Sequence, residues 1–130
     1  MANNDNLAMV LSQMDNAIKV GKSSVTTSIS SNLIKEVLTL MKNEGYLAEW
    51  VEHEDSKGNY LTITFNGKLN KCGVIKPRFA VGVDNFEQYE KRYLPALGFG
   101  LLFISTNKGL LSQVQAKEEN VGGRLISYCY

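Results

Sequence analysis

The chain has 130 residues, 44% of them hydrophobic, and a formal net charge of +1 at pH 7. This composition is ordinary for a globular protein and argues against intrinsic disorder, while the length allows one domain or two small lobes. Two cysteines without CxxC spacing, Cys72 and Cys129, and a single histidine, His53, argue against a disulfide scaffold or a zinc site, so we expect reduced thiols, no metal and no cofactor.

The first half of the chain predicts an α-β-α-β-β lobe. Apolar residues recur at helical spacing over residues 7–18, and residues 25–29 alternate as in a short strand. Two further strands, near 46–52 and 60–65, are joined by a tight turn and form a hairpin. Between the first strand and this hairpin the sequence predicts a second helix, whose N-cap is one of Ser30, Ser31 and Asn32.

The second half predicts short helices between extended segments. Asn66-Gly67 is a turn, and we place the boundary between an N-terminal lobe (1–66) and a C-terminal lobe (67–130) there. Asp84-x-x-Glu87 and Ser112-x-x-Gln115 both have the spacing of a helix capping box. Residues 101–105 and 124–130 read as strands. We therefore expect an α+β protein whose N-terminal α/β lobe packs on a mostly antiparallel β lobe with short helices.

The charges are unevenly divided between the two halves. Residues 1–66 carry a net charge of −3, whereas residues 67–130 carry +4. The stretch 68–78 contains four cations and no acid. Such asymmetry is typical of a surface that faces a polyanion, and the side chains that we expect to neutralise phosphates are Lys71, Lys76 and Arg78.

A polar loop, Ser105-Thr106-Asn107-Lys108-Gly109, directly follows the apolar run 101–104, and a second loop, Gly122-Gly123-Arg124, follows soon after. Hydroxyl and amide groups on a rigid strand suit the recognition of irregular RNA, where base edges and 2′-hydroxyls are approached closely. The glycines would let the RNA come near the backbone. The alternative, that these are ordinary turn residues, fits the composition equally well.

The sequence gives little support for an enzyme. A nucleophilic Cys72 would need a base, and the only histidine, His53, lies in a hairpin among acidic residues. Gly98-Phe99-Gly100 is too short for a phosphate-binding glycine loop and precedes a strand instead of a helix. We expect no catalytic activity and no small-molecule substrate.

The amino-terminal residues 1–6 lack the basic and apolar regions of a secretion signal. The longest apolar stretch, near 97–104, contains glycines and is too short to cross a membrane. We therefore expect a cytoplasmic protein without membrane partners.

In order and spacing, motifs along nearly the whole chain resemble those of the universal family of small-subunit ribosomal protein eight, in its archaeal and eukaryotic-cytosolic branch. The motifs of the first half are Leu7-Ala8, Asn16-Ala17 and Asn43-Glu44-Gly45-Tyr46-Leu47. Those of the second half are Lys68-Leu69-Asn70-Lys71-Cys72-Gly73, Ile75-Lys76-Pro77-Arg78-Phe79, Tyr93-Leu94-Pro95-Ala96, Ile104-Ser105-Thr106 with Gly109, and Gly122-Gly123-Arg124.

The resemblance implies a structural ribosomal protein that binds the central domain of small-subunit rRNA and supports subunit assembly. It also implies neighbouring small-subunit ribosomal proteins, including universal family five, as partners. Asn107 stands where family members usually have a third hydroxyl residue. The residues expected to bind RNA are Ser105, Thr106, Asn107, Lys108, Gly109, Gly122, Gly123, Arg124, Lys71, Lys76 and Arg78, with a second, weaker contact at Lys19, Lys22, Ser30 and Ser31.

One alternative from another functional class is left open by the sequence. The chain could keep this fold but work away from the ribosome, as a protein-interaction module that uses its acidic hairpin.

Overall fold

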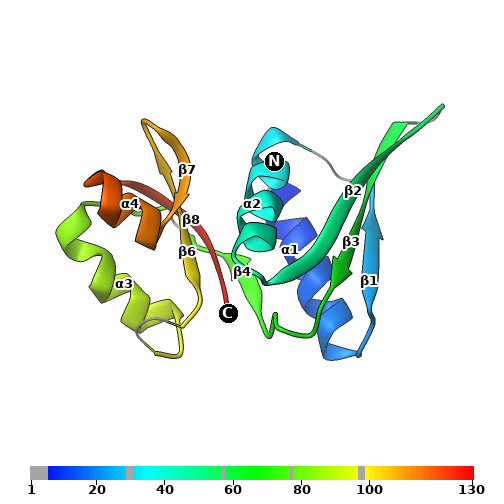
Figure 1. Ribbon diagram of the computed structural model, residues 1–130, viewed down its shortest axis with the longest axis horizontal. Helices are drawn as coiled ribbons and strands as arrows, with labels where there is room; N and C mark the ends of the chain where they lie inside the picture. The colour runs from blue at the N-terminus through cyan, green and yellow to red at the C-terminus, as the bar shows by residue number, and fades with distance from the viewer. Residues whose placement is uncertain (1–5, 29–30, 57, 77, 97–98) are drawn as a thin grey trace. The chain divides into compact units, whose positions relative to one another are not determined.

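The computed structural model describes residues 6–28, 31–56, 58–76, 78–96 and 99–130. The chain divides into two compact units, Met1–Cys72 and Gly73–Tyr130 (Figure 1). Helices and antiparallel strands occur in both units, so the predicted α+β class is confirmed. No helix in these ranges is long and apolar enough to span a membrane.

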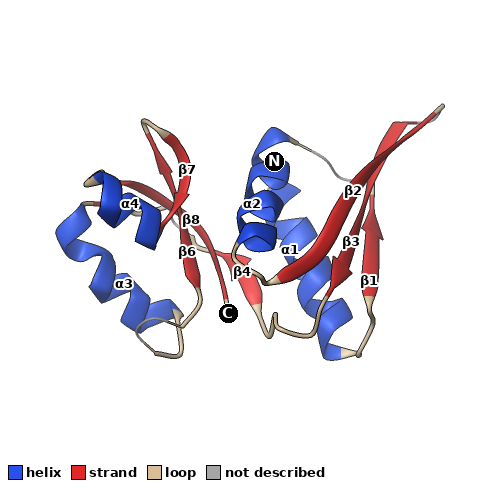
Figure 2. Ribbon diagram, viewed as in Figure 1, coloured by secondary structure: helices blue, strands red, loops and turns tan. Residues whose placement is uncertain are grey.

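The first unit is a three-stranded antiparallel sheet with two helices on one face (Figure 2). The strand order is β1-β3-β2, and the hairpin β2–β3 was predicted. The buried stripe of α1 repeats every three to four residues, as the spacing predicted, and Leu61 and Ile63 of the sheet are also fully buried. The elements are α1 (Asn6–Lys19), β1 (Ser24–Thr27), α2 (Asn32–Asn43), β2 (Leu47–Asp55) and β3 (Gly58–Phe65).

Of the three predicted caps of α2, Ser31 is the N-cap. Its Oγ accepts a hydrogen bond from the backbone N–H of Ile34 at 3.3 Å. This bond satisfies one of the N–H groups that the first turn of a helix leaves without a partner. Ser30 lies outside the described residues.

The first unit extends a few residues past the predicted boundary at Asn66-Gly67. Leu69 and Cys72 are both buried, and the Cys72 thiol donates a hydrogen bond to the carbonyl oxygen of Leu11 in α1 at 3.4 Å. These contacts attach residues 67–72 to the first unit. The strand β4 (Cys72–Val74) begins at its last residue.

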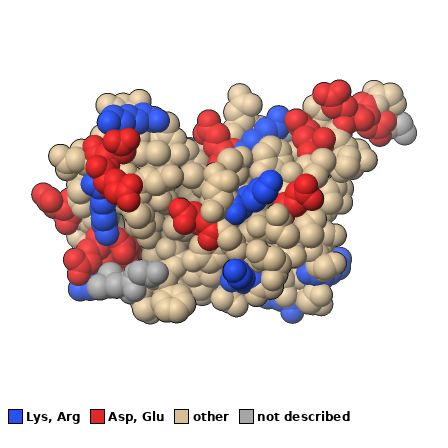
Figure 3. Space-filling view, viewed as in Figure 1, with Lys and Arg blue, Asp and Glu red and all other residues tan. Residues whose placement is uncertain are grey.

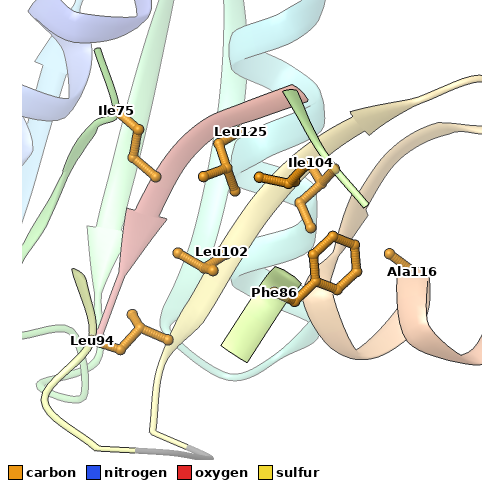
Figure 4. Close-up of a cluster of buried hydrophobic side chains, with 8 residues drawn as sticks. Ile75, Phe86, Leu94, Leu102, Ile104, Ala116 and Leu125 are labelled. Atoms are coloured by element: carbon orange, nitrogen blue, oxygen red, sulfur yellow. The ribbon is translucent and has the colours of Figure 1, made fainter. Parts of the chain in front are cut away.

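The second unit is built on a sheet of order β4-β8-β6-β7, with β5 also paired to β8. Its core is a cluster of buried apolar side chains between this sheet and two helices, seven of which Figure 4 labels: Ile75, Phe86, Leu94, Leu102, Ile104, Ala116 and Leu125. The elements are β5 (Ala80–Val81), the 3-10 turn η1 (Val83–Asn85), α3 (Phe86–Tyr93), β6 (Leu101–Thr106), β7 (Gly109–Ser112), α4 (Gln113–Glu119) and β8 (Gly123–Cys129).

One of the two predicted capping boxes is present and the other is wrong. At α4, Ser112 Oγ accepts from the Gln115 N–H at 3.3 Å, and the Gln115 side chain accepts from the Ser112 N–H at 3.2 Å. At α3, Asp84 lies in η1, and the N-cap Asn85 forms no side-chain capping bond. The preceding 3-10 turn moves the start of α3 past Asp84, so the spacing alone was not sufficient.

Candidate nucleic-acid interface

The polar loop predicted from the sequence is a two-residue turn between β6 and β7. Thr106 pairs with Gly109 at the end of the ladder, and Asn107 and Lys108 form the turn between them. The backbone of Gly109 has φ +106°, a conformation that glycine adopts readily. The strand that leads into the turn is anchored in the core, because residues 101–104 of β6 are fully or almost fully buried.

The Thr106 hydroxyl is used within the turn. It donates to the Gly109 carbonyl oxygen at 2.8 Å and accepts from the Lys108 N–H at 3.1 Å. Its single proton is therefore not available to a ligand. The Ser105 side chain is exposed, and its hydroxyl has no hydrogen-bond partner among the described residues.

Strand pairing brings Ser105 next to Arg124, although nineteen positions separate them in the sequence. Arg124 pairs on its other side with Ala80 of β5. Because direct cross-strand partners point to the same face of a sheet, these three side chains form one exposed row. The row lies on the face opposite the buried core residues Ile104 and Leu125.

The glycine pair before Arg124 allows three strands to approach closely. A Cβ atom on Gly123 would collide with the carbonyl oxygen of Ser105, and one on Gly122 would lie 2.5 Å from the carbonyl oxygen of Val81. Packing thus accounts for glycine at both positions. Their predicted role in letting RNA approach remains a prediction.

Sequence reasoning missed one residue at the turn, the acid Glu119 at the end of α4. Its Oε2 lies 3.5 Å from Lys108 Nζ. No motif links the two positions, because the contact depends on the unpredicted strand β7 and on how α4 folds back from it.

The predicted phosphate-binding cations of 68–78 are exposed. Lys71 is in the first unit, whereas Lys76 and Arg78 are in the second. Arg78 leads directly into the segment that pairs with β8, since the carbonyl oxygen of the next residue, Phe79, accepts from the Leu125 N–H at 2.9 Å. Arg78 therefore lies at the sheet edge that adjoins the start of β8.

The predicted second contact belongs to the first unit. Lys19 forms an ion pair with Asp15 at 3.0 Å within α1. Lys22 borders two shallow hollows of about 450 and 470 Å³. Ser31 caps α2, as described above, so its hydroxyl is already used.

Cys72, considered above as a nucleophile, is buried. Burial, together with the nearby Asp15 carboxylate, raises the pKa of the Cys72 thiol to about 12, so this thiol is protonated at neutral pH. No group of three or more His, Cys, Asp or Glu side chains in the described ranges is placed to hold a metal ion. Acidic side chains instead gather at the projecting end of the β2–β3 hairpin, at the upper right of Figure 3.

Comparison with known proteins identifies relatives over nearly the full length. A family model described as ribosomal protein S8 matches residues 5–130. A curated protein of Methanococcoides burtonii, small ribosomal subunit protein uS8, is 48% identical over 126 residues, which are 97% of this chain and 97% of that protein. Both matches span the two units, so they include every residue of the β6–β7 turn and of the β8 start.

Proposed function

We propose, given that this chain belongs to the ribosomal protein S8 family, that it binds the central domain of small-subunit rRNA and supports assembly of the subunit. Membership makes it a protein of the small ribosomal subunit, in a family of structural ribosomal proteins and not of enzymes. The observation that supports the proposal best is the exposed pair of Ser105 and Arg124 beside a turn locked by Thr106.

In this proposal Ser105 recognises the shape of the RNA. Its free hydroxyl can both donate and accept, which suits base edges and 2′-hydroxyls of an irregular helix. The adjacent guanidinium of Arg124 can bind a phosphate through two parallel hydrogen bonds. Asn107, exposed at the tip of the turn, adds an amide that can donate and accept at the position where the family resemblance implies a hydroxyl.

The remaining cations position the RNA and do not distinguish one RNA from another. Lys71, Lys76 and Arg78 neutralise phosphates, which gives affinity that falls with salt and does not depend on sequence. Lys19 and Lys22 provide a weaker second contact. Ser31 takes part through the backbone N–H groups at the start of α2, since its hydroxyl caps that helix.

On the ribosome, which we place in the cytoplasm, the partners are the rRNA and neighbouring small-subunit proteins, including universal family five. The acidic hairpin β2–β3 repels phosphate and is therefore assigned to protein or solvent. If the chain instead worked away from the ribosome through this hairpin, it would not co-sediment with small subunits at moderate salt.

Binding to matched RNAs tests the proposal. The purified chain is titrated with a transcript of the central domain and with a control in which the irregular helix is made fully base-paired. Ser105→Ala should reduce the preference for the first RNA by about 1–3 kcal/mol with an almost unchanged salt slope. Arg78→Ala should weaken binding to both RNAs and lower the slope by about one.

Two outcomes would contradict the proposal. One is a wild-type protein that binds both RNAs equally. The other is a Ser105→Ala variant that behaves like Arg78→Ala, because the separation between recognition and positioning would then be absent.

A further inference from the structure

We infer that Glu119 is a specificity-determining residue: by holding the Lys108 ammonium it limits phosphate binding that does not depend on RNA shape. The inference rests on the proposed RNA-binding function and adds to it an acidic residue that acts on the turn from α4.

Lys108 and Glu119 belong to different elements of the second unit. Lys108 is at the tip of the β6–β7 turn, whereas Glu119 ends α4, which starts from the capping box at Ser112. Two residues before Glu119, Lys117 Nζ lies 2.7 Å from Glu90 Oε1 of α3, and the Glu90 side chain is only 5% exposed. This second ion pair joins the last turn of α4 to α3, close to the residue whose carboxylate lies 3.5 Å from Lys108 Nζ.

The ion pair of Lys108 and Glu119 is weak but well placed. The two atoms are 3.5 Å apart and both side chains are about half exposed, at 51% and 53%. Exposed ion pairs are weak, so a phosphate can displace the carboxylate. The pair therefore lowers the affinity of Lys108 for phosphate without abolishing it.

This restraint affects different RNAs unequally. An RNA that Ser105 and Arg124 hold in one register presents its phosphates at fixed positions. Any of these phosphates that lies near Lys108 also faces the Glu119 carboxylate. An RNA without the matching shape is free to shift until one of its phosphates reaches Lys108. Removing the Glu119 charge should therefore strengthen the binding of the unmatched RNA more, which is specificity by selective repulsion.

The chain offers a matched control in the neighbouring acid. Glu118 is exposed on the same helix turn and forms no ion pair in the described ranges. Glu118→Gln thus changes the net charge by the same amount as Glu119→Gln while leaving Lys108 paired. Lys108→Gln, alone and combined with Glu119→Gln, shows whether any effect passes through the ammonium.

The experiment measures the Kd of the full chain and of these variants for the central-domain transcript and for its fully base-paired control over a range of salt. Glu119→Gln should strengthen binding of the control RNA by roughly 2- to 5-fold and raise its salt slope by about one. Glu118→Gln should change either quantity by less than half as much. In the Lys108→Gln background the effect of Glu119→Gln should disappear.

Equal effects of Glu119→Gln and Glu118→Gln on the control RNA would overturn the inference, as would an effect that persists without Lys108. A wild-type protein that does not distinguish the two RNAs would instead refute the proposed function. In that case no specificity is left for Glu119 to determine, and the comparison of the two glutamine variants on the control RNA shows only whether Glu119 limits phosphate binding by Lys108.

Discussion

Hydroxyl side chains in the second unit have different roles that follow from their partners and not from their residue type. The Thr106 hydroxyl forms hydrogen bonds within the turn, and the Ser112 hydroxyl caps helix α4. Ser127 is fully buried, and its Oγ has no hydrogen-bond partner among the residues that the structure describes. Ser105 is exposed and unpaired within the described chain, so among the serine and threonine side chains of this unit it is the one whose hydroxyl can meet a ligand.

Gly123 should tolerate no side chain. In Gly123→Ala the new Cβ would collide with the Ser105 carbonyl oxygen, which is backbone within the sheet and cannot move aside. We expect a loss of about 1–3 kcal/mol in the free energy of unfolding, as for other overpacked sites. Gly82→Ala is the control, because nothing lies within 4 Å of its Cβ position, and urea denaturation should find it near neutral. Equal stabilities of the two variants would contradict the close approach of β6 and β8.

Cys72 should make stability depend on alkaline pH. Its pKa is raised from 9.0 to about 12 in the folded chain, so between these values the unfolded chain releases a proton that the folded chain keeps. The contribution of the buried Cys72 thiol to the free energy of unfolding is complete below pH 9 and is lost as pH rises toward 12. Urea denaturation at several pH values should show a smaller alkaline loss of stability in Cys72→Ala. An identical pH dependence of wild type and variant would mean that the thiol is not buried as described.

At the scale of elements, the sequence predicted what local chemistry determines. The stripe of α1, the hairpin β2–β3 and the capping box of α4 each depend on residues close in the chain. Strand β7 was not predicted, because Leu110 and Leu111 are both half-buried and do not alternate between buried and exposed. Its extended conformation depends mainly on its pairing with β6. The false capping box at Asp84 failed for a related reason, since a 3-10 turn outside the motif displaced the helix start.

The capping box of α4 should contribute measurably to stability. Ser112→Ala removes the acceptor for the Gln115 N–H at a buried position, so we expect a loss of about 1 kcal/mol or more in the free energy of unfolding. Ser127→Ala serves as the control, because that buried hydroxyl has no hydrogen-bond partner in the described part of the chain and its removal should be neutral or stabilising. If Ser127→Ala were as harmful as Ser112→Ala in thermal or urea denaturation, the distinction between the two hydroxyls would be wrong.

At the scale of the whole molecule, the sequence singled out two loops as candidate RNA-binding segments but did not predict that strand pairing brings them together. The polar loop at 105–109 and the glycine pair were recognised separately from composition and resemblance. Their joining into one exposed row needed the register of β5, β8 and β6, which no local pattern encodes. Glu119 was missed for the same reason.

The rRNA contact of the β6–β7 turn can be tested by directed cleavage. Cys72 and Cys129 are both buried, so Asn107→Cys introduces a selectively reactive thiol at the exposed tip of the turn, to which an iron chelate can be attached. Ser56→Cys, at the exposed end of the acidic β2–β3 hairpin, is the control. With the labelled chain bound to small-subunit rRNA, we expect hydroxyl-radical cuts from position 107 confined to one irregular helix of the central domain, and none at that helix from position 56. Cuts from position 107 that are absent, scattered over the rRNA or the same as those from position 56 would contradict recognition of rRNA by this turn.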